Sequence, residues 1–510
     1  MEQKNLKTSI VGFDTVFSES AECPIDVDFT LPDYYAEISK ILKCCATARV
    51  SSKGINGNTI SIEGTVTLTV IYCGSDKSIN SYEYQYPFSK SFDIGANEGN
   101  SQINVKTKCE YINCRAVTGR KIDIHGAVGI YVDLLRRCVT EVVSDCDCRD
   151  IELLRDSVPA TIPLGNAEKY LIMDEEIELG AGQPDIRCII RYDADATVTE
   201  SKIMAGKSMV KGELLLKLLY APADNATPQT VRCKLPFGQL IEIDGISEDC
   251  ECDSKVCIAH IEVKPRVSAS GECRNLILNA KLLITSTCCC NNDVGVITDA
   301  YSRKYEAEVL KNMVCFNKIV ENVNSNFSCK KKFEFGSDAI SSITDMWCDT
   351  RIDTVKFCDN AMRISGVVSV YIIAQDSTCV PTFYEKMVDF EYAYPISIEG
   401  EYKSTPKITV TGVNYTFVGE NEIELRIELN VCAAVYKCCN LPIITDIKVN
   451  DKIITSKKSD AAMTLYFASE KEKIWDIARK YSAGIEEIKQ INDITEEILT
   501  VDKMILIPNN

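Results

Sequence analysis

Histidine and cysteine are the residue types in this sequence that could carry acid–base, nucleophilic or metal chemistry. The chain has 2 histidines and 26 cysteines among its 510 residues. The nearest approach to a metal motif is Cys250-x-Cys252 followed by Cys257 and His260, and thiolate with imidazole is a ligand set that Zn²⁺ prefers. The spacing of this group is irregular, and no Cys-x-x-Cys pair occurs anywhere in the chain. We therefore expect no metal site and interpret most cysteines as small, reduced, apolar side chains in strands.

Catalytic signatures are also missing from the sequence. It contains no GxSxG, HExxH, P-loop or GxGxxG motif. His125 alternates with Ile124 in a strand-like segment, so we expect its side chain to face solvent. The 74 acidic residues would permit a glycosidase-like pair of carboxylates, but no placement singles one out. The sequence therefore predicts a protein without enzymatic activity and without a cofactor.

Charge and hydropathy narrow the choice of partners. The formal net charge is −18, which repels phosphate backbones and anionic lipid, so we expect neither nucleic acid nor a membrane surface as partner. The first twenty residues lack the apolar run of a signal peptide, and no stretch is long and apolar enough to span a bilayer. We expect no direct membrane insertion and a protein that stays in the compartment where it is made.

The elements that could position these residues come in three copies. Residues 59–72, 208–220 and 361–374 each form a long alternating segment with a glycine near its start. These glycines, Gly64, Gly212 and Gly366, lie about 150 residues apart. Alternation with Val, Ile, Thr and Tyr predicts half-buried strands, and the glycine predicts a bulge or a close backbone approach.

A second long strand is predicted about sixty residues after the first in every copy, at 121–135, 275–287 and 422–436. The fold class is therefore mainly β, with three tandem antiparallel, sandwich-like repeat domains at 1–160, 161–300 and 301–445. Residues 300–323, between the second and third copies, fit either a helix or an extended segment.

The pattern changes after residues 446–462, which are polar and charged and read as a linker. Residues 463–468 and 503–508 look like strands, whereas 473–481 and 484–492 carry apolar residues at helical spacing. The last part of the chain, 463–510, is thus predicted to be a small βααβ module.

This module resembles the LysM family, whose members bind N-acetylglucosamine polymers such as peptidoglycan or chitin. The resemblance rests on a set of mostly apolar positions, namely Tyr466, Ile474, Trp475, Ile477, Ala478, Tyr481, Ile488, Asn492, Leu499, Ile505, Ile507 and Pro508. The family's Gly-Asp-Thr in the first loop is replaced here by Lys471, Glu472 and Lys473, and the glycine before the last strand is Asp502. Because that loop forms one wall of the family's sugar groove, glycan binding becomes doubtful.

Trp475 is one of only 2 tryptophans and lies at the edge of the predicted helix's buried stripe. A partly exposed tryptophan is a favoured interface anchor, although it could instead pack against the module's own sheet. We take Trp475, Lys471, Glu472, Lys473 and Asp502 as candidate partner-binding residues.

Tandem acidic β-domains followed by a LysM-like module resemble the SPOCS-domain proteins of spore-forming Firmicutes, with clostridial members the most similar. The resemblance implies a non-enzymatic scaffold or adaptor in spore coat assembly, located on the mother-cell side of the forespore surface, in the cytoplasm. It implies that the LysM-like module binds the coat ATPase SpoIVA, with other coat proteins as further partners.

Two other functions remain open from the sequence. The chain could be a peptidoglycan-binding protein that reaches the wall by a non-standard export route, or an enzyme acting on the wall through an unrecognised catalytic fold. An intact first loop and a signal peptide would favour the former, and a uniquely placed polar triad would favour the latter; we find none of these.

Overall fold

The computed structural model describes residues 5–95, 101–148, 150–204, 206–224, 227–248, 250–269, 271–336, 340–454 and 462–508. The first unit comprises β1 (Asn5–Thr30), β2 (Ile38–Asn56), β3 (Thr59–Gly74), β4 (Ile79–Asp93), β5 (Ser101–Ala116) and β6 (Lys121–Cys146). The second comprises β7 (Ile151–Glu178), β8 (Ile186–Met204), β9 (Lys207–Pro222), β10 (Gln229–Glu242), β11 (Glu251–Arg266) and β12 (Asn275–Ser302). The third comprises β13 (Tyr305–Glu334), β14 (Ile340–Cys358), β15 (Ala361–Asp376), β16 (Pro381–Pro395), β17 (Glu401–Ser404), β18 (Lys407–Phe417) and β19 (Glu422–Ile453).

Each unit is a sandwich of two antiparallel sheets, which confirms the predicted mainly-β class. In the first unit the sheets have the orders β2-β3-β4 and β1-β6-β5. Alternate residues of both sheets meet in one core; Leu68 of β3 and Ile124 of β6 are fully buried in it. The second unit repeats these orders as β8-β9-β10 and β7-β12-β11, and the third as β14-β15-β16 and β13-β19 with β17 and β18.

The glycine that recurs in the first long strand is explained by its neighbour across the sheet. Gly64 lies directly opposite Phe88, and Gly212 lies opposite Phe237. A Cβ on Gly212 would come within 2.3 Å of both the Phe237 ring and the carbonyl oxygen of Thr197. The third unit repeats this with Gly366 opposite Phe390. Each glycine also faces a register shift in β2, β8 or β14, so both the predicted bulge and the predicted close approach are present.

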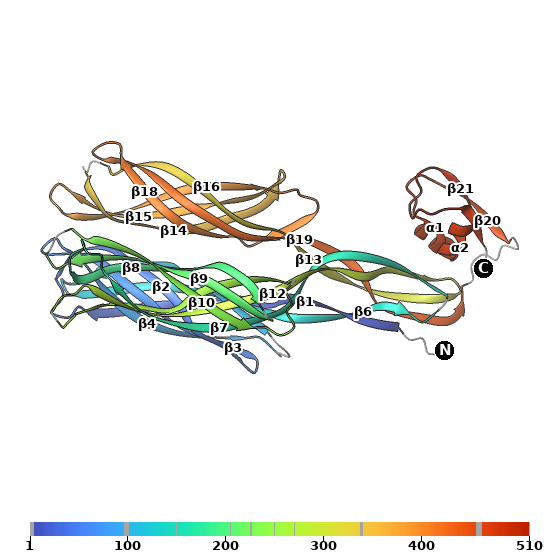
Figure 1. Ribbon diagram of the computed structural model, residues 1–510, viewed down its shortest axis with the longest axis horizontal. Coiled ribbons are helices and arrows are strands. Elements are labelled where there is room, and N and C mark those ends of the chain that lie inside the picture. Colours follow the sequence, from blue (N-terminus) through green and yellow to red (C-terminus); the bar gives the residue numbers. More distant parts are fainter. Residues whose placement is uncertain are drawn as a thin grey trace.

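In each unit, the two longest strands continue beyond their sheet as a ribbon. The ribbons belong to β1 and β6, β7 and β12, and β13 and β19, and they pack together into a stalk (Figure 1). A two-stranded ribbon is marginal by itself, so the three stabilise one another through shared apolar clusters. The buried residues of these clusters are Val142, Val143, Val158, Ala160, Val296, Ile297, Ala300, Phe316, Ile443, Ile444 and Ile447.

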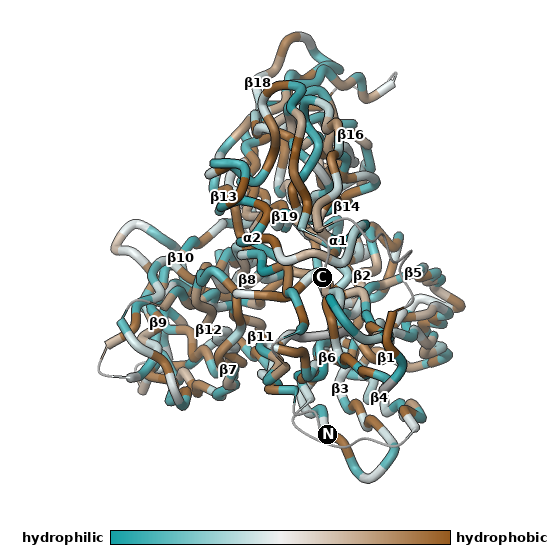
Figure 2. Tube along the Cα trace, turned by 90° about the vertical axis from the view of Figure 1, so that its right-hand side faces the viewer, coloured by the Kyte–Doolittle hydropathy of each residue, from teal (hydrophilic) through white to brown (hydrophobic). Residues whose placement is uncertain are grey.

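The three units surround a common axis, and Figure 2, a view turned by 90°, shows them as three lobes. In the stalk the sequence repeats accordingly, as Val142-Val143-Ser144-Asp145, Val296-Ile297-Thr298-Asp299 and Ile443-Ile444-Thr445-Asp446. Each aspartate bonds the ribbon of the next unit. Arg155 binds Asp145 at 2.7 Å, Lys311 binds Asp299 at 2.8 Å, and the Asn5 amide donates to Asp446 at 2.8 Å.

At the other end, here called the head, the units meet around a second apolar cluster that includes Ile71, Leu219 and Ile373. A buried charge network joins the second unit to the third beside it. Asp345 accepts from Arg191 at 2.9 Å and from Lys217 at 2.5 Å, and the Arg191 guanidinium lies 4.0 Å from the Trp347 ring centre. These contacts make the three units one packed body.

Several predicted boundaries differ from the observed elements. The boundary at 160/161 falls inside β7 and that at 300/301 falls inside β12, because these strands run on into the stalk. Residues 305–323 are extended and belong to β13, so the helical alternative for 300–323 is wrong. Residues 446–453 of the predicted linker are the end of β19, paired with β13, and 455–461 lie outside the described residues.

The chain ends in the predicted βααβ order with β20 (Met463–Ala468), α1 (Ile474–Tyr481), α2 (Ile485–Asn492) and β21 (Lys503–Pro508). This C-terminal module sits at the far end of the stalk (Figure 1). Neither of the described helices, each 8 residues long, has the length and apolar character needed to cross a membrane.

Candidate partner-binding site

The core of the C-terminal module forms between its two helices and the inner side of the β20–β21 pair. Ile474, Ile477 and Ile488 are at most 1% exposed, as the helical spacing predicts. Asn492 closes the module by accepting from the Leu506 amide at 2.7 Å and donating to the Leu506 carbonyl at 2.7 Å. Residues 463–508 thus have a packed core of their own.

Trp475 is buried against another part of the chain. Only 7% of the residue is exposed, and its indole Nε1 donates a hydrogen bond to Asp299 of β12 at 3.0 Å. Its ring meets Tyr301 edge-on, with the ring centres 5.1 Å apart. The expectation of a partly exposed Trp475 is therefore wrong, because the stalk covers the helix edge that the sequence pattern left open. The alternative that it packs only on the module's own sheet is wrong too.

Further contacts fix the module on the stalk. The Tyr301 hydroxyl donates to the Ala483 carbonyl at 2.7 Å, and Arg303 pairs with Glu487 at 3.2 Å. Asp299 also binds Arg479 of α1 at 2.6 Å. Asp299 occupies one of three equivalent positions in the stalk; like Asp145 and Asp446 it bonds the ribbon of the next unit, and it binds the module in addition.

The charges around Asp299 favour its ionised form. Burial raises the pKa of this carboxyl, but hydrogen bonds from Lys311 and Trp475, with the charges of Lys311 and Arg479, outweigh burial and hold the pKa below its usual value. Burial also raises the pKa of the Tyr301 hydroxyl, which stays protonated and can donate. The contact is therefore an anchor with complementary charges on both sides.

The other predicted residues lie together on the first loop and beside the last strand. Lys471, Lys473 and Asp502 are exposed. Asp502 accepts from the Glu470 amide at 2.7 Å, and Glu472 accepts from the Ser469 amide at 3.1 Å. Two backbone donors of this loop are thus occupied by the chain's own carboxylates. The structure does not bring Trp475 into this group.

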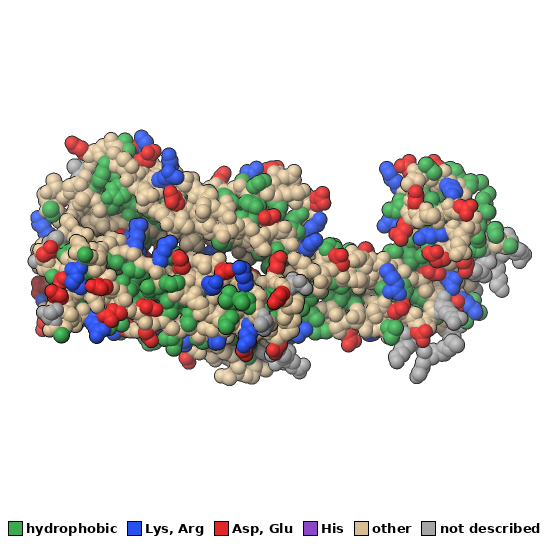
Figure 3. Space-filling model, in the orientation of Figure 1, with side chains coloured by type: hydrophobic (Ala, Val, Ile, Leu, Met, Phe, Trp, Pro, Cys, Tyr) green, Lys and Arg blue, Asp and Glu red, His purple; other side chains and the backbone are tan. Residues whose placement is uncertain are grey.

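The most apolar exposed surface of the module lies elsewhere, on the outer side of the β20–β21 pair. We call it the outer face; its residues are Met463, Leu465, Phe467, Met504 and Leu506, with exposures between 38% and 62%. Leu465 lies opposite Leu506 and Phe467 opposite Met504, so the side chains form one contiguous patch. Figure 3 shows hydrophobic side chains gathered on the side of the module away from the three units.

Sequence reasoning missed this surface, although a signal was present. In strands with one face in a core, polar residues should alternate with apolar ones. In the segments MTLYFA and KMILIP the alternate positions are apolar as well. The surplus of apolar residues in two short strands was the sign that the solvent side is also made for contact.

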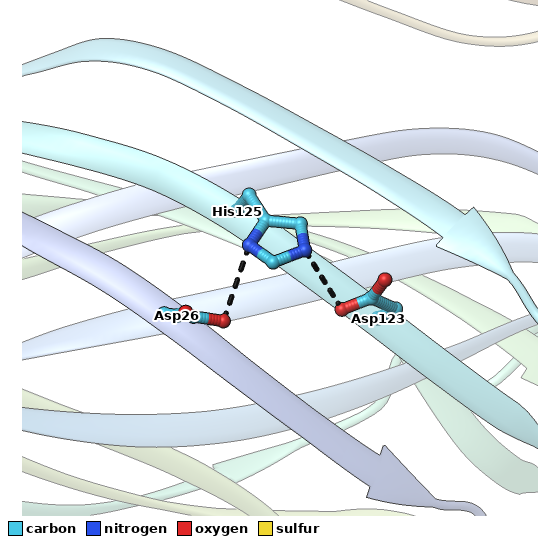
Figure 4. A group of neighbouring side chains, drawn as sticks. All are labelled: Asp26, Asp123 and His125. Carbon is cyan, nitrogen blue, oxygen red and sulfur yellow. Dashed lines mark ion pairs between the residues drawn. The ribbon is translucent and has the colours of Figure 1, made fainter.

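A second cluster with possible chemistry surrounds His125 on the exposed side of the first unit. His125 of β6 lies between Asp26 and Asp123, with nitrogen–oxygen distances of 3.1 Å to each (Figure 4). The Asp123 carboxylate is also bound by Arg115 at 2.7 Å, and hydrogen bonding to Arg115 lowers its pKa. His125 is half exposed, as predicted, and the group reads as a cross-strand ladder of compensated charges.

Comparison with known proteins finds a family match in two of the three repeated units. The family model of the SipL SPOCS domain matches residues 37–117 and 185–266, which span β2–β5 of the first unit and β8–β11 of the second. Two segments of the chain are SPOCS domains. This match confirms the resemblance to SPOCS-domain proteins that was drawn from the repeats, and it suggests a sporulation-related protein. No curated protein and no solved structure matches the chain.

The third unit resembles the two matched units, except that β17 and β18 stand where the others have the single strand β5 or β11. β14, β15 and β16 repeat the order of β2, β3 and β4, with the glycine–phenylalanine pair at the same place. The matched segments therefore belong to two of the three units of the body that carries the C-terminal module at its end.

Proposed function

We propose that this protein is a non-enzymatic adaptor in spore coat assembly, and that its C-terminal, LysM-like module binds a SpoIVA-like coat ATPase. It would act on the mother-cell side of the forespore surface, in the cytoplasm, with other coat proteins as further partners. The match of two SPOCS domains supports a role in sporulation. The remainder of the proposal depends on the module.

The outer face is the observation that carries the proposal. Five large apolar side chains lie exposed on twelve residues of strand, and Phe467 alone is 62% exposed. Clustered exposed apolar groups on a folded module are typical of protein–protein contact sites. Burying one Leu or Phe yields about 1.5–3 kcal/mol, so a few of them suffice for a specific complex. The anchored Trp475 supports this assignment, because it turns the outer face away from the stalk.

The state of the first loop favours a protein over a sugar polymer as ligand. A sugar groove needs backbone donors and a close approach, and here the Ser469 and Glu470 amides are taken by Glu472 and Asp502. Lys471 has a positive φ of 68°, which suits the glycine of the family pattern better than lysine. Peptidoglycan binding remains the second candidate function, and only the βααβ order of the module supports it.

The three units then serve as a rigid carrier. Their shared clusters in head and stalk fix the position of the module relative to the SPOCS domains, and the long stalk keeps the outer face clear of them. The faces of the SPOCS domains are available to other coat proteins.

Affinity purification from sporulating cells tests this function. We expect the tagged chain to retain the coat ATPase, and the double variant Leu465→Lys/Phe467→Lys to lose it while the SPOCS domains keep their other partners. Purified chain mixed with insoluble peptidoglycan should stay in the supernatant. Pelleting with peptidoglycan, together with retention of the ATPase by the double variant, would refute the proposal.

A further inference from the structure

Four cysteines of the second unit meet at the junction of head and stalk. Cys250 lies just before β11, Cys252 is near its start, and Cys288 and Cys290 lie on β12. Cys252 is the direct cross-strand partner of Cys288, and the structure joins Cys250 to Cys290 and Cys252 to Cys288 as disulfides. We call these four residues the cysteine square.

All four side chains project from the same sheet face. Residues i and i+2 of a strand point the same way and lie about 7 Å apart. Across the strands the Cα–Cα distances are 4.8 Å for Cys250 and Cys290 and 4.1 Å for Cys252 and Cys288. In a tetrahedral zinc–thiolate site the sulfurs lie about 2.3 Å from the metal. The four Cα atoms form a rectangle with these spacings. Four cysteine side chains that lean toward its centre can place their sulfurs at this distance from a single ion.

The other two units have no such site at the same place. The strand registers make Ile103 and Leu134 of the first unit equivalent to Cys252 and Cys288, and both are buried apolar residues. In the third unit the equivalent of Cys288 is Val435, which is fully buried. The second unit thus has thiols where the first has buried apolar residues at the Cys252 and Cys288 positions, whereas Cys250 and Cys290 correspond to Ser101 and Arg136.

The residues next to the cysteine square are also more polar than their equivalents in the first unit. Ser254 and Ser286 follow the cysteines on the same face, and their hydroxyls lie 2.9 Å apart. Ser286 also contacts Ser208 at 2.8 Å, and both are fully buried. The first unit has Val105, Val132 and Ile60 at these positions. Buried hydroxyls in place of aliphatic groups make a core less stable. A role in supporting a polar site would explain why they are present.

A hydroxyl also reaches the square itself. The Ser247 oxygen lies 3.3 Å from the Cys250 sulfur, within hydrogen-bonding distance for a sulfur acceptor. Hydroxyl donors beside a thiolate stabilise its charge and orient it, as outer groups do around metal ligands. Four thiols with a hydroxyl donor beside them form the ligand set of a soft tetrahedral cation.

We propose that the reduced cysteine square binds one Zn²⁺ ion through four thiolates. On binding, the metal displaces four protons from four thiols, and no electron is transferred. The disulfide-linked form has no thiolate and binds no metal. Because the square lies where the three-stranded sheet narrows to the ribbon, the ion would fasten β11 to β12 at the base of the segment that leads to Asp299. This inference is independent of the proposed coat partner.

Cobalt titration of the full-length chain tests the site directly. The chain is reduced, freed of metal and titrated with Co²⁺ without oxygen. We expect one equivalent to produce the visible bands of tetrahedral cobalt and a sulfur-to-cobalt charge-transfer band, and one equivalent of Zn²⁺ to abolish both. The same chain, fully oxidised, should give neither.

Two variants separate binding from folding. Cys252→Ile/Cys288→Leu restores the residues of the first unit, so it should fold and lose the bands. Cys44→Ser/Cys114→Ser removes a pair of cysteines that contact each other in the first unit, and should keep them. Absence of the bands in reduced wild type, or their persistence in Cys252→Ile/Cys288→Leu, would overturn the proposal.

Discussion

The indole of Trp475 and the carboxylate of Asp299 are joined by a 3.0 Å hydrogen bond between the C-terminal module and the second unit. The bond is buried at both ends, with 7% of Trp475 and 8% of Asp299 exposed. The sequence suggested that Trp475 anchors a partner protein, whereas in the structure it anchors the module to the stalk of the same chain. The module's orientation, and hence the direction of its outer face, depends on this bond.

Removing the carboxylate should release the module. Asp299→Ala leaves the Trp475 N–H and the Arg479 guanidinium without their acceptor, at a cost of about 1–3 kcal/mol for an unsatisfied buried donor. We expect the tryptophan emission to shift to the red, because Trp475 becomes exposed to solvent. Trp347, the other tryptophan, lies in the head and contributes equally to the spectra of the variant and the wild type. Asp145→Ala changes the equivalent residue of the first unit, which does not touch the module. Identical spectra for Asp299→Ala and wild type would show that the bond does not hold the module.

Acid should release the module in the same way. The docked Asp299 has a pKa below its usual 3.8, so docking gains stability that is complete above pH 3.8 and is lost as pH falls through the docked value. We expect the emission of Trp475 to shift red below about pH 4, before the sheets unfold by circular dichroism. In Asp299→Asn this acid step should be missing. A step of equal size in that variant would assign it to another group.

The recurrent glycine should tolerate no side chain. Gly212→Ala places a Cβ 2.3 Å from the Phe237 ring and the Thr197 carbonyl, and overpacking of this kind costs about 1–3 kcal/mol. Gly238→Ala, on the neighbouring strand, meets nothing within 4 Å and provides the matched control. Urea unfolding should show a lower midpoint for Gly212→Ala alone. Equal midpoints would mean that the phenylalanine moves aside without cost.

The charge network in the head should be essential to the packing of the second unit on the third. Asp345→Ala leaves Arg191 buried and without one of its carboxylate partners, and breaking a buried pair in this way costs about 3–5 kcal/mol. Asp353→Ala breaks an exposed pair with Arg351 and should cost less than about 1 kcal/mol. Differential scanning calorimetry compares the two. A similar loss for both would contradict a special role for Asp345.

Local patterns in the sequence predicted much of the fold. Alternation located β3, β9 and β15 to within two residues, and helical spacing located α1 and α2 equally well. The glycine in the first long strand predicted a close approach at this position, but it did not reveal that Phe88 is the residue that approaches. These features depend on residues close together along the chain, where periodicity carries the information.

Contacts between distant segments escaped prediction. Trp475 and Asp299 are 176 residues apart, so the spacing within the helix could not reveal that β12 covers its edge. The strands of the stalk were predicted too short, because β6, β12 and β19 become less regular in hydropathy where they leave the sheets. The cysteine square was missed because Cys252 and Cys288 become neighbours only through the register of β11 and β12.

The most direct test of the account is the affinity of the purified full-length chain for the purified coat ATPase, measured by isothermal titration calorimetry. Leu465→Lys/Phe467→Lys should bind at least about tenfold more weakly, since each lost apolar contact is worth about 1.5–3 kcal/mol. Lys471→Ala/Lys473→Ala, on the first loop, should bind with nearly wild-type affinity. Undiminished binding by the outer-face variant, with loss of binding by the loop variant, would contradict the account.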